Sequence, residues 1–233
     1  MKNSNHINPT SSDSDLKIKV CGMGSEENIK EVASLQPDYI GFIFHEKSPR
    51  NFQTEIPEIS SEIKKTGVFV DATLDYIVEK VKKYNFQAVQ LHGKESPEFC
   101  RDLRNVQELS TVETIKVFSV MEEFNFDILK DYEGVVDYFL FDTKGKNKGG
   151  NGVLFNWELL KNYSSNTPFF LSGGIGVEEV EKIRELQFYF RNRGKLNILY
   201  AIDVNSRFET APAVKDKNTL IEFKKKLLNL QEK

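Results

Sequence analysis

The stretch Asp38-Tyr39-Ile40-Gly41-Phe42-Ile43-Phe44 is almost wholly apolar. A strand with one face in water alternates apolar and polar residues, whereas a strand covered on both faces is apolar throughout. Strands of the second kind belong to parallel sheets that carry helices on their faces. The stretch therefore predicts a buried strand in an α/β protein.

Similar short apolar runs lie on both sides of this stretch, and charged segments with helical period separate them. The expected strands fall at about 16–21, 39–44, 67–70, 88–91, 114–120, 135–141, 168–171 and 196–201. Helical patterns include 25–35, 74–84, 177–186 and 218–230. Eight strand-then-helix units in a chain of 233 residues suit a closed (β/α)₈ (TIM) barrel near its lower size limit.

An open doubly wound sheet is the structural alternative. Such a sheet usually carries a dinucleotide-binding glycine fingerprint after its first strand. Residues 21–27 read Cys-Gly-Met-Gly-Ser-Glu-Glu, which lacks the third glycine of that fingerprint. We therefore expect a single barrel domain over 16–233. Residues 1–15 are rich in Ser, Asn and Asp without the pattern of a signal peptide, so we expect a short disordered tail there.

The composition limits the kinds of molecule that the chain is expected to bind. The net charge of −3 and the pI of about 5.8 argue against nucleic acid, which needs a basic face. No apolar stretch approaches the roughly 20 residues of a membrane span, so no membrane partner is expected. Cys21 and Cys100 form neither a metal-binding spacing nor a disulfide framework, and Cys100 lies in the start of an amphipathic helix as a structural residue. A reducing cytoplasm fits this usage.

The segments that follow the expected strands are polar and rich in glycine, unlike the strands themselves. In a barrel the active site lies at the carboxyl ends of the strands, so this contrast predicts a ligand site at that end. The segments are Cys21-Gly22, His45 to Arg50, Asp71, His92-Gly93, Asp142-Thr143-Lys144, Ser172-Gly173-Gly174 and Asp203 to Ser206.

Cys21 ends the first expected strand. Side chains alternate along a strand, so Lys17, Lys19 and Cys21 share one face. A lysine two residues before a thiol on the same face would favour the thiolate and make it a usable base. The alternative is a small buried apolar residue, the commonest role of a free cysteine.

The segments after the seventh and eighth strands resemble a phosphate grip. Ser172-Gly173-Gly174 lets bare backbone N–H groups approach an anion, and Asn205-Ser206 opens a short helix that favours an anion as well. Barrels often bind phosphate between these two loops. Two ordinary turns are the alternative.

Asp142 stands at the rim of the expected barrel, directly after three apolar residues. Partial desolvation would raise its pKa and let it donate a proton near neutral pH. A helix cap or an ion-pair partner is the commoner role of such an aspartate. The charged, glycine-rich segment 143–152 is interpreted as a mobile loop that closes over a substrate.

Arg50 and His92 allow two interpretations each. The guanidinium of Arg50, on the loop after the second strand, could hold a carboxylate in bidentate fashion, although a solvated surface arginine is the default. His92 could be an acid/base group, and a structural hydrogen bond is at least as good an interpretation.

Nearly the whole chain after Leu16 resembles one family, the phosphoribosylanthranilate isomerases of tryptophan biosynthesis. No single motif is decisive, whereas the order and spacing of all of them together are specific. The motifs are Lys19-Val20-Cys21-Gly22, 38–44 leading to Lys47-Ser48-Pro49-Arg50, Gly67-Val68-Phe69-Val70, Val89-Gln90-Leu91-His92-Gly93, Phe141-Asp142-Thr143-Lys144, Gly149-Gly150-Asn151-Gly152, Phe155-Asn156-Trp157, Leu171-Ser172-Gly173-Gly174-Ile175, Ile202-Asp203-Val204-Asn205-Ser206, Glu209, Pro212 and Lys215-Asp216.

The resemblance implies an Amadori rearrangement of N-(5'-phosphoribosyl)anthranilate to the corresponding deoxyribulose phosphate, without a metal or a redox cofactor. Asp142 would be the general acid, Cys21 the general base, and Arg50 the partner of the anthranilate carboxylate. The remaining implied site residues are the phosphate-holding Gly173, Gly174, Asn205 and Ser206, with His92 and Asp203 in supporting roles. The implied partner is this small phosphosugar substrate, and the chain is expected to be a monomer or a homodimer.

One departure from the family pattern concerns the phosphate loop, where the usual Ser-Gly pair reads Ser206-Arg207. Arg207 either adds a phosphate contact or replaces a glycine at the cost of backbone strain.

Two other functions compete with the isomerase. Barrel isomerases of histidine biosynthesis resemble this layout but place an aspartate where Cys21 stands. A non-catalytic phosphate-binding barrel would be expected to have lost the acid or the base, and both are present.

Overall fold

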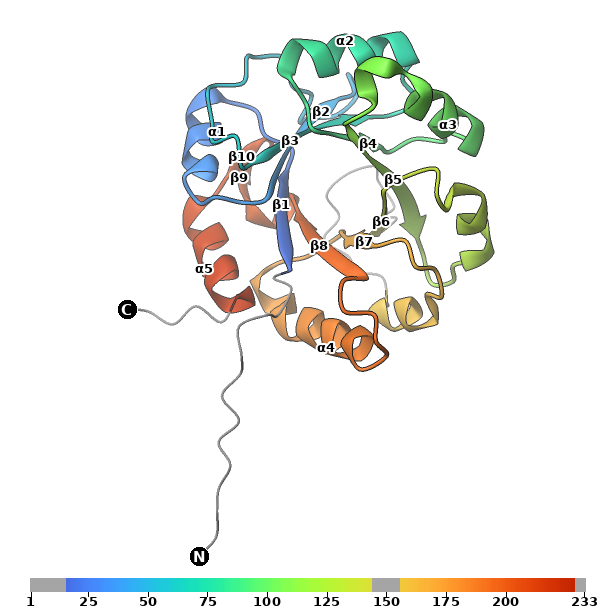
Figure 1. The fold of residues 1–233 in the computed structure, drawn as a ribbon. Helices are drawn as coiled ribbons and strands as arrows, with labels where there is room; N and C mark the ends of the chain where they lie inside the picture. Colours follow the sequence, from blue (N-terminus) through green and yellow to red (C-terminus); the bar gives the residue numbers. More distant parts are fainter. Residues whose placement is uncertain (1–15, 144–155, 229–233) are drawn as a thin grey trace, which may run out of the picture.

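Eight parallel strands close into a barrel in the computed structural model, which describes residues 16–143 and 156–228 (Figure 1). Neighbours along the chain pair in order, and β8 pairs with β1. The strands are β1 (Lys17–Cys21), β2 (Tyr39–Phe44), β3 (Lys64–Phe69), β4 (Ala88–Leu91), β5 (Glu113–Val120), β6 (Tyr138–Thr143), β7 (Phe169–Leu171) and β8 (Leu199–Val204). The expected tail over 1–15 and the expected mobile segment from Lys144 onward lie outside the described residues.

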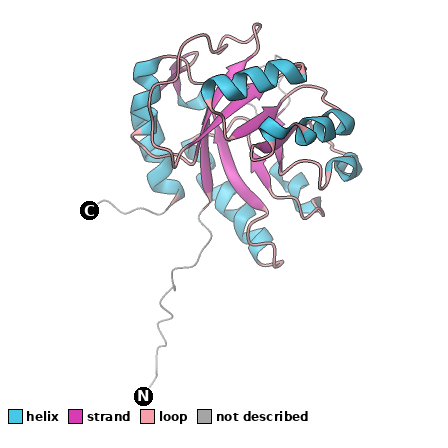
Figure 2. Ribbon diagram, turned by 45° about the horizontal axis from the view of Figure 1, so that its top comes forward, coloured by secondary structure: helices cyan, strands magenta, loops and turns pink. Residues whose placement is uncertain are grey.

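Helices surround the barrel on its outer face (Figure 2). The α-helices are α1 (Glu26–Ala33), α2 (Leu74–Tyr84), α3 (Pro97–Asn105), α4 (Val180–Arg191) and α5 (Lys217–Leu227). The 3₁₀ helices are η1 (Gln107–Leu109), η2 (Phe126–Tyr132), η3 (Trp157–Asn162), η4 (Val177–Glu179) and η5 (Ser206–Phe208), and a small ribbon joins β9 (Glu209–Ala211) to β10 (Val214–Lys215). Within 16–143 and 156–228, no helix is both long and apolar enough to cross a membrane.

The connections are less regular than eight strand-then-helix units. Residues 45–63, between β2 and β3, contain no helix, and Pro57 in this segment interrupts any continuous helical hydrogen bonding. The helix expected at 177–186 is divided into η4 and the longer α4. Polar side chains cap the amino ends of α1, α2, α3 and α5, as Ser25 does for α1 and Ser96, followed by Pro97, does for α3.

Two strands continue further than their sequence suggests. β6 runs to Thr143 and β8 to Val204, so that Asp142 and Asp203 are strand residues and not loop residues. Their backbones still pair with neighbours: Asp142 lies opposite Ser119 on β5, and Asp203 opposite Lys19 on β1. The strand ladder therefore fixes the backbone positions of both aspartates.

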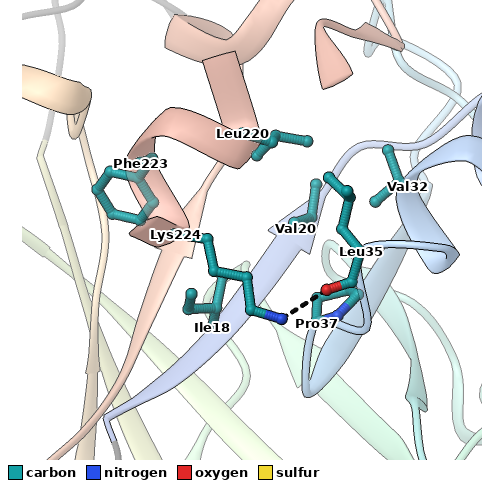
Figure 3. Close-up of a pocket in the computed structure, with 8 residues that line it drawn as sticks. All are labelled: Ile18, Val20, Val32, Leu35, Pro37, Leu220, Phe223 and Lys224. Carbon is teal, nitrogen blue, oxygen red and sulfur yellow. Dashed lines mark hydrogen bonds between the residues drawn. The ribbon is translucent and has the colours of Figure 1, made fainter. Parts of the chain in front are cut away.

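The two faces of β1 have different roles: one packs against the surrounding helices, and the other carries the candidate site residues. Ile18 and Val20 point outward against α1 and α5, where they line a small apolar pocket with Val32 and Phe223 (Figure 3). This pocket lies outside the barrel, so it is not part of the candidate site. Because side chains alternate, Lys19 and Cys21 point the other way, into the barrel, and they share one face as the sequence predicted.

Aromatic side chains fill the barrel toward the amino ends of the strands. Tyr39, at the start of β2, packs edge-on against Phe170 of β7, and its hydroxyl donates to Glu113 Oε2 over 2.9 Å. Tyr138 of β6 stacks on Tyr200 of β8, with ring centroids 4.5 Å apart. This plug leaves the carboxyl ends as the end of the barrel available to a ligand.

Candidate active site

The loops after β1, β2 and β8 converge at the carboxyl end of the barrel. Gly22, directly after β1, has a positive φ of 78° that favours glycine. A Cβ placed there would come within 2.8 Å of both Arg50 Cδ and Asn205 Oδ1. Gly22 thus allows the side chains of Arg50 and Asn205 to approach the end of β1, which holds Cys21.

The thiol of Cys21 is buried inside this end of the barrel. A Cβ on Gly41 of β2 would lie 2.8 Å from Cys21 Sγ, so the missing side chain of Gly41 provides the room for the thiol. Burial raises the pKa of Cys21, since the thiolate loses its hydration. Lys19 and Lys215 act in the opposite direction, but burial outweighs them.

Lys19 has a second partner that the sequence did not suggest. Its Nζ donates to Asp203 Oδ1 over 2.9 Å, and both side chains are buried. Burial alone would lower the pKa of Lys19, whereas the charges of Asp203 and Cys21 raise it, and the net pKa is raised. Lys19 therefore stays protonated beside the thiol and, as expected, favours the thiolate; burial still sets the net direction for Cys21.

Replacing Lys19 by methionine is expected to raise the pKa of Cys21 by about one unit or more, because a nearby cation is lost and Asp203 is left uncompensated. The measurement is the rate of Cys21 alkylation against pH in a Cys100→Ala background. Cys100 is fully buried, and burial raises its pKa to about 11. With Cys100 replaced by alanine, the measured alkylation is that of Cys21 alone.

Breaking a buried ion pair costs about 3–5 kcal/mol, so the fold must be monitored in the same experiment. Lys116→Met is the matched control, because it breaks the buried pair of Lys116 with Glu95 on the far side of the barrel. We expect this control to leave the alkylation midpoint unchanged. A midpoint that stays the same in a folded Lys19→Met variant would refute the role of Lys19.

Arg50 is a buried, ion-paired residue and not a solvated surface arginine. Its Nε donates to Glu209 Oε1 and Oε2 over 2.8 and 3.0 Å, and its Nη2 donates to Oε2 over 2.6 Å. The hydrogen bond to Glu209 raises the pKa of Arg50, and burial only partly opposes it. Glu209 thus fixes the guanidinium at the carboxyl end of the barrel.

Lys215 completes this network. Its buried ammonium donates to Glu209 Oε1 over 2.5 Å and to Asn205 Oδ1 over 2.7 Å. Asn28 of α1 holds the backbone of Lys215 on both sides, with hydrogen bonds of 2.7 and 2.9 Å. Sequence reasoning marked Glu209 and Lys215 as family landmarks but assigned them no role, since Glu209 meets Arg50 across 159 residues of chain.

His92 and Asp142 meet at the end of the barrel. His92 Nε2 lies 3.5 Å from Asp142 Oδ2, and Gln90 Nε2 lies 3.4 Å from His92 Nδ1. Both His92 and Asp142 are partly exposed, with 35% and 26% of the side chain accessible. Among the described residues Asp142 is therefore the partner of His92, which is one of the two commoner roles that its sequence position left open, and its carboxylate keeps part of its surface exposed.

A buried ion pair supports the strand end that carries His92. Lys116 Nζ of β5 donates to Glu95 Oε2 and to the Gly93 carbonyl, each over 2.9 Å. Glu95 in turn accepts from the backbone N–H of Gly93 over 2.9 Å and of Asp71 over 2.9 Å. The loops after β3 and β4 are thereby tied together.

The loops after β7 and β8 present backbone N–H groups, as the glycine pair suggested. Gly173 and Gly174 have φ values of 90° and 68°, and a Cβ on Gly173 would collide with Thr143 of β6. Within the described residues, the backbone N–H groups of Gly173, Gly174, Ser206 and Arg207 make no hydrogen bond. Four donors at two adjacent loops form a candidate anion site.

The fold and this site define a (β/α)₈-barrel enzyme in which a carboxyl group, a thiol and two loops with free backbone N–H groups lie at the same end of the barrel. Residues 18–226 match the family described as N-(5'-phosphoribosyl)anthranilate (PRA) isomerase, and the chain belongs to that family. The family consists of isomerases that function in tryptophan biosynthesis. This membership separates the chain from the histidine-pathway enzymes and the non-catalytic barrels that the sequence left as alternatives.

Individual relatives agree with the family match. The N-(5'-phosphoribosyl)anthranilate isomerase of Parabacteroides distasonis is 43% identical over 218 residues, which cover 91% of this chain and 93% of that protein. The crystal structure of the Thermotoga maritima phosphoribosyl anthranilate isomerase has a TM-score of 0.72 and 28% identity, over 92% of this chain and 100% of that one.

A second solved structure contains a ligand. It is a phosphoribosyl anthranilate isomerase in complex with reduced 1-(o-carboxyphenylamino)-1-deoxyribulose 5-phosphate. Its TM-score is 0.68 and its identity 25%, over 92% of this chain and 100% of that chain.

Proposed function

We propose that this chain converts N-(5'-phosphoribosyl)anthranilate to 1-(2-carboxyphenylamino)-1-deoxyribulose 5-phosphate. The observation that carries the proposal is that a carboxyl and a thiol, Asp142 on β6 and Cys21 on β1, lie at the same end of one closed barrel. Only β7 and β8 separate the two strands. A sugar bound at this end has an acid on one side and a base on the other.

The proposed reaction needs two proton transfers. Asp142 gives a proton to the furanose ring oxygen, the bond from C1 to that oxygen breaks, and the nitrogen lone pair forms an iminium at C1. Cys21, as the thiolate, then removes the proton from C2, and the electrons of that bond form an enolamine. Protonation of the enolamine at C1 and loss of the hydroxyl proton at C2 give the ketone. Positioned acid/base groups accelerate such steps by about 10²–10⁴-fold each.

Arg50 is the proposed partner of the anthranilate carboxylate. Glu209 occupies its Nε and Nη2 atoms, and Nη1 has no partner among the described residues. A guanidinium held in this way offers its remaining N–H groups in a fixed direction. The positive charge of Arg50 lies near Cys21, which contributes to the raised pKa of the arginine.

The phosphate is proposed to bind the N–H groups of Gly173, Gly174 and Ser206, with Asn205 shaping the loop after β8. Asn205 Oδ1 accepts from Lys215, so this loop has a defined position before a ligand arrives. Asp203 and His92 keep supporting roles. Asp203 holds Lys19, and His92 contacts Asp142.

A fluorescence assay tests the proposal. Freshly generated N-(5'-phosphoribosyl)anthranilate is mixed with the purified chain, and loss of its fluorescence is followed beside a Cys21→Ala/Asp142→Asn double variant. We expect rapid loss with the wild type and only the spontaneous background rate with the double variant. A folded wild-type chain that leaves the background rate unchanged would overturn the proposal.

A further inference from the structure

We propose that Arg207 is a positioning residue that joins the two loops of the phosphate site and thereby sets the affinity for the phosphate group. This inference rests on the proposed function, because that function assigns the substrate phosphate to these loops. Arg207 belongs to η5, after β8, and its Nε donates to the carbonyl of Gly174, after β7, over 3.2 Å. One side chain therefore connects the two groups of free N–H donors directly.

A second contact holds the other end of the same loop. Arg207 Nη2 lies 3.8 Å from Glu179 Oε1, and the side chain of Glu179 is only 8% exposed. The other carboxylate oxygen, Oε2, accepts from the backbone N–H of Gly176 over 2.8 Å. Arg207 thus contacts Gly174 and Glu179, the two ends of the segment 174–179. Glu179 also accepts the hydrogen bond from Gly176 inside the segment.

These contacts matter because the N–H donors come from separate loops. A phosphate group must meet Gly173 and Gly174 on one side and Ser206 and the Arg207 backbone on the other, so affinity depends on the spacing of the two loops. Donors that are held in place before binding lose less conformational entropy when the ligand arrives. The side chain of Arg207 is 45% exposed, and its guanidinium adds a positive charge beside the site.

The backbone at Arg207 is unstrained. Among the described residues other than glycine, positive φ values occur at Gln36, Asp71, Asn85 and Ala213, and Arg207 is not one of them. The sequence left two outcomes for the change from Ser-Gly to Ser206-Arg207, and the structure excludes the strained one. The arginine side chain is accommodated without a left-handed conformation.

Two measurements on the full chain test the inference. The dissociation constant of inorganic phosphate is measured by calorimetry, and kcat and KM are measured with N-(5'-phosphoribosyl)anthranilate. For Arg207→Met we expect phosphate to bind about tenfold more weakly and KM to rise about tenfold, as for the loss of charge-assisted hydrogen bonds. The kcat should stay within about twofold, since the acid and the base are untouched.

Two further variants sharpen the test. Arg207→Lys keeps the charge but cannot span both contacts, so it should recover only part of the affinity. Arg101→Met is the matched control, because Arg101 is an arginine of similar exposure, 48%, paired with Glu98 on α3, and its loss should change neither constant.

Several outcomes would overturn the inference: phosphate affinity and KM within twofold of wild type in Arg207→Met, an equal loss in Arg101→Met, or a fall in kcat alone. Failure of the proposed function is seen separately. A wild-type chain that shows no turnover, yet binds phosphate in an Arg207-dependent way, refutes the reaction and retains the role of Arg207.

Discussion

Replacing Asp142 by asparagine is expected to lower kcat by about 10²–10⁴-fold, the usual effect of removing a positioned general acid. Asparagine has nearly the same shape, so the contact with His92 can persist while the transferable proton is lost. Steady-state kinetics by fluorescence, with substrate well above KM, measures the effect. The ring oxygen then leaves without protonation, which is the physical reason for the slow turnover.

Asp127→Asn is the control for this prediction, since Asp127 is an exposed aspartate on η2 that pairs with Lys130. It should retain wild-type kcat. Asp142→Glu keeps a carboxyl group and should recover part of the activity. The role of Asp142 would be refuted by a folded Asp142→Asn variant with a kcat within threefold of wild type.

Cys21→Ala is expected to lower kcat/KM by a similar factor of about 10²–10⁴, because no base is left to remove the C2 proton. The pH dependence gives a second readout. Burial raises the pKa of Cys21, so in the wild type the thiolate fraction, and with it kcat/KM, should increase as the pH rises from neutral toward that pKa. The residual activity of Cys21→Ala should lose this increase.

Cys100→Ala provides the comparison, because Cys100 is also a buried free cysteine, but it lies on the helix α3 and not on a strand of the barrel. It should keep both the activity and the pH profile of the wild type. Wild-type turnover in Cys21→Ala would leave the reaction in place and remove Cys21 as its base.

Much of the barrel could be predicted from local patterns. The second and fourth strands, Tyr39–Phe44 and Ala88–Leu91, and the helix Leu74–Tyr84 have the bounds that their apolar runs indicated. Other bounds were displaced: β3 begins at Lys64 and not at Gly67, and β6 and β8 begin and end two to three residues later than expected, so that Asp142 and Asp203 continue the strand. A polar residue near a strand end is typical of a loop, and only the pairing with β5 and β1 shows that the ladder continues.

The candidate site also contains residues that local patterns predicted and residues that they did not. Cys21, His92, Asp142, Gly173 and Gly174 each follow or end a strand, and parallel strands in a barrel bring such positions to one end. The partners of these residues have no local signal. Glu209 pairs with Arg50 across 159 positions, and Asp203 pairs with Lys19 across 184.

The sequence by itself determined the order of strands, the end of the barrel that carries polar groups, and the family, since each depends on patterns within short segments or on their order along the chain. The tertiary structure alone decided the electrostatics of the site. Lys19 lies beside Cys21 and stays protonated, but its charge is paired with Asp203, and burial outweighs its effect on the pKa of Cys21. Arg50 is buried against Glu209, and Arg207 connects two loops. Charges act through space in a medium of low polarity, so their effect depends on distances and burial that no local pattern contains.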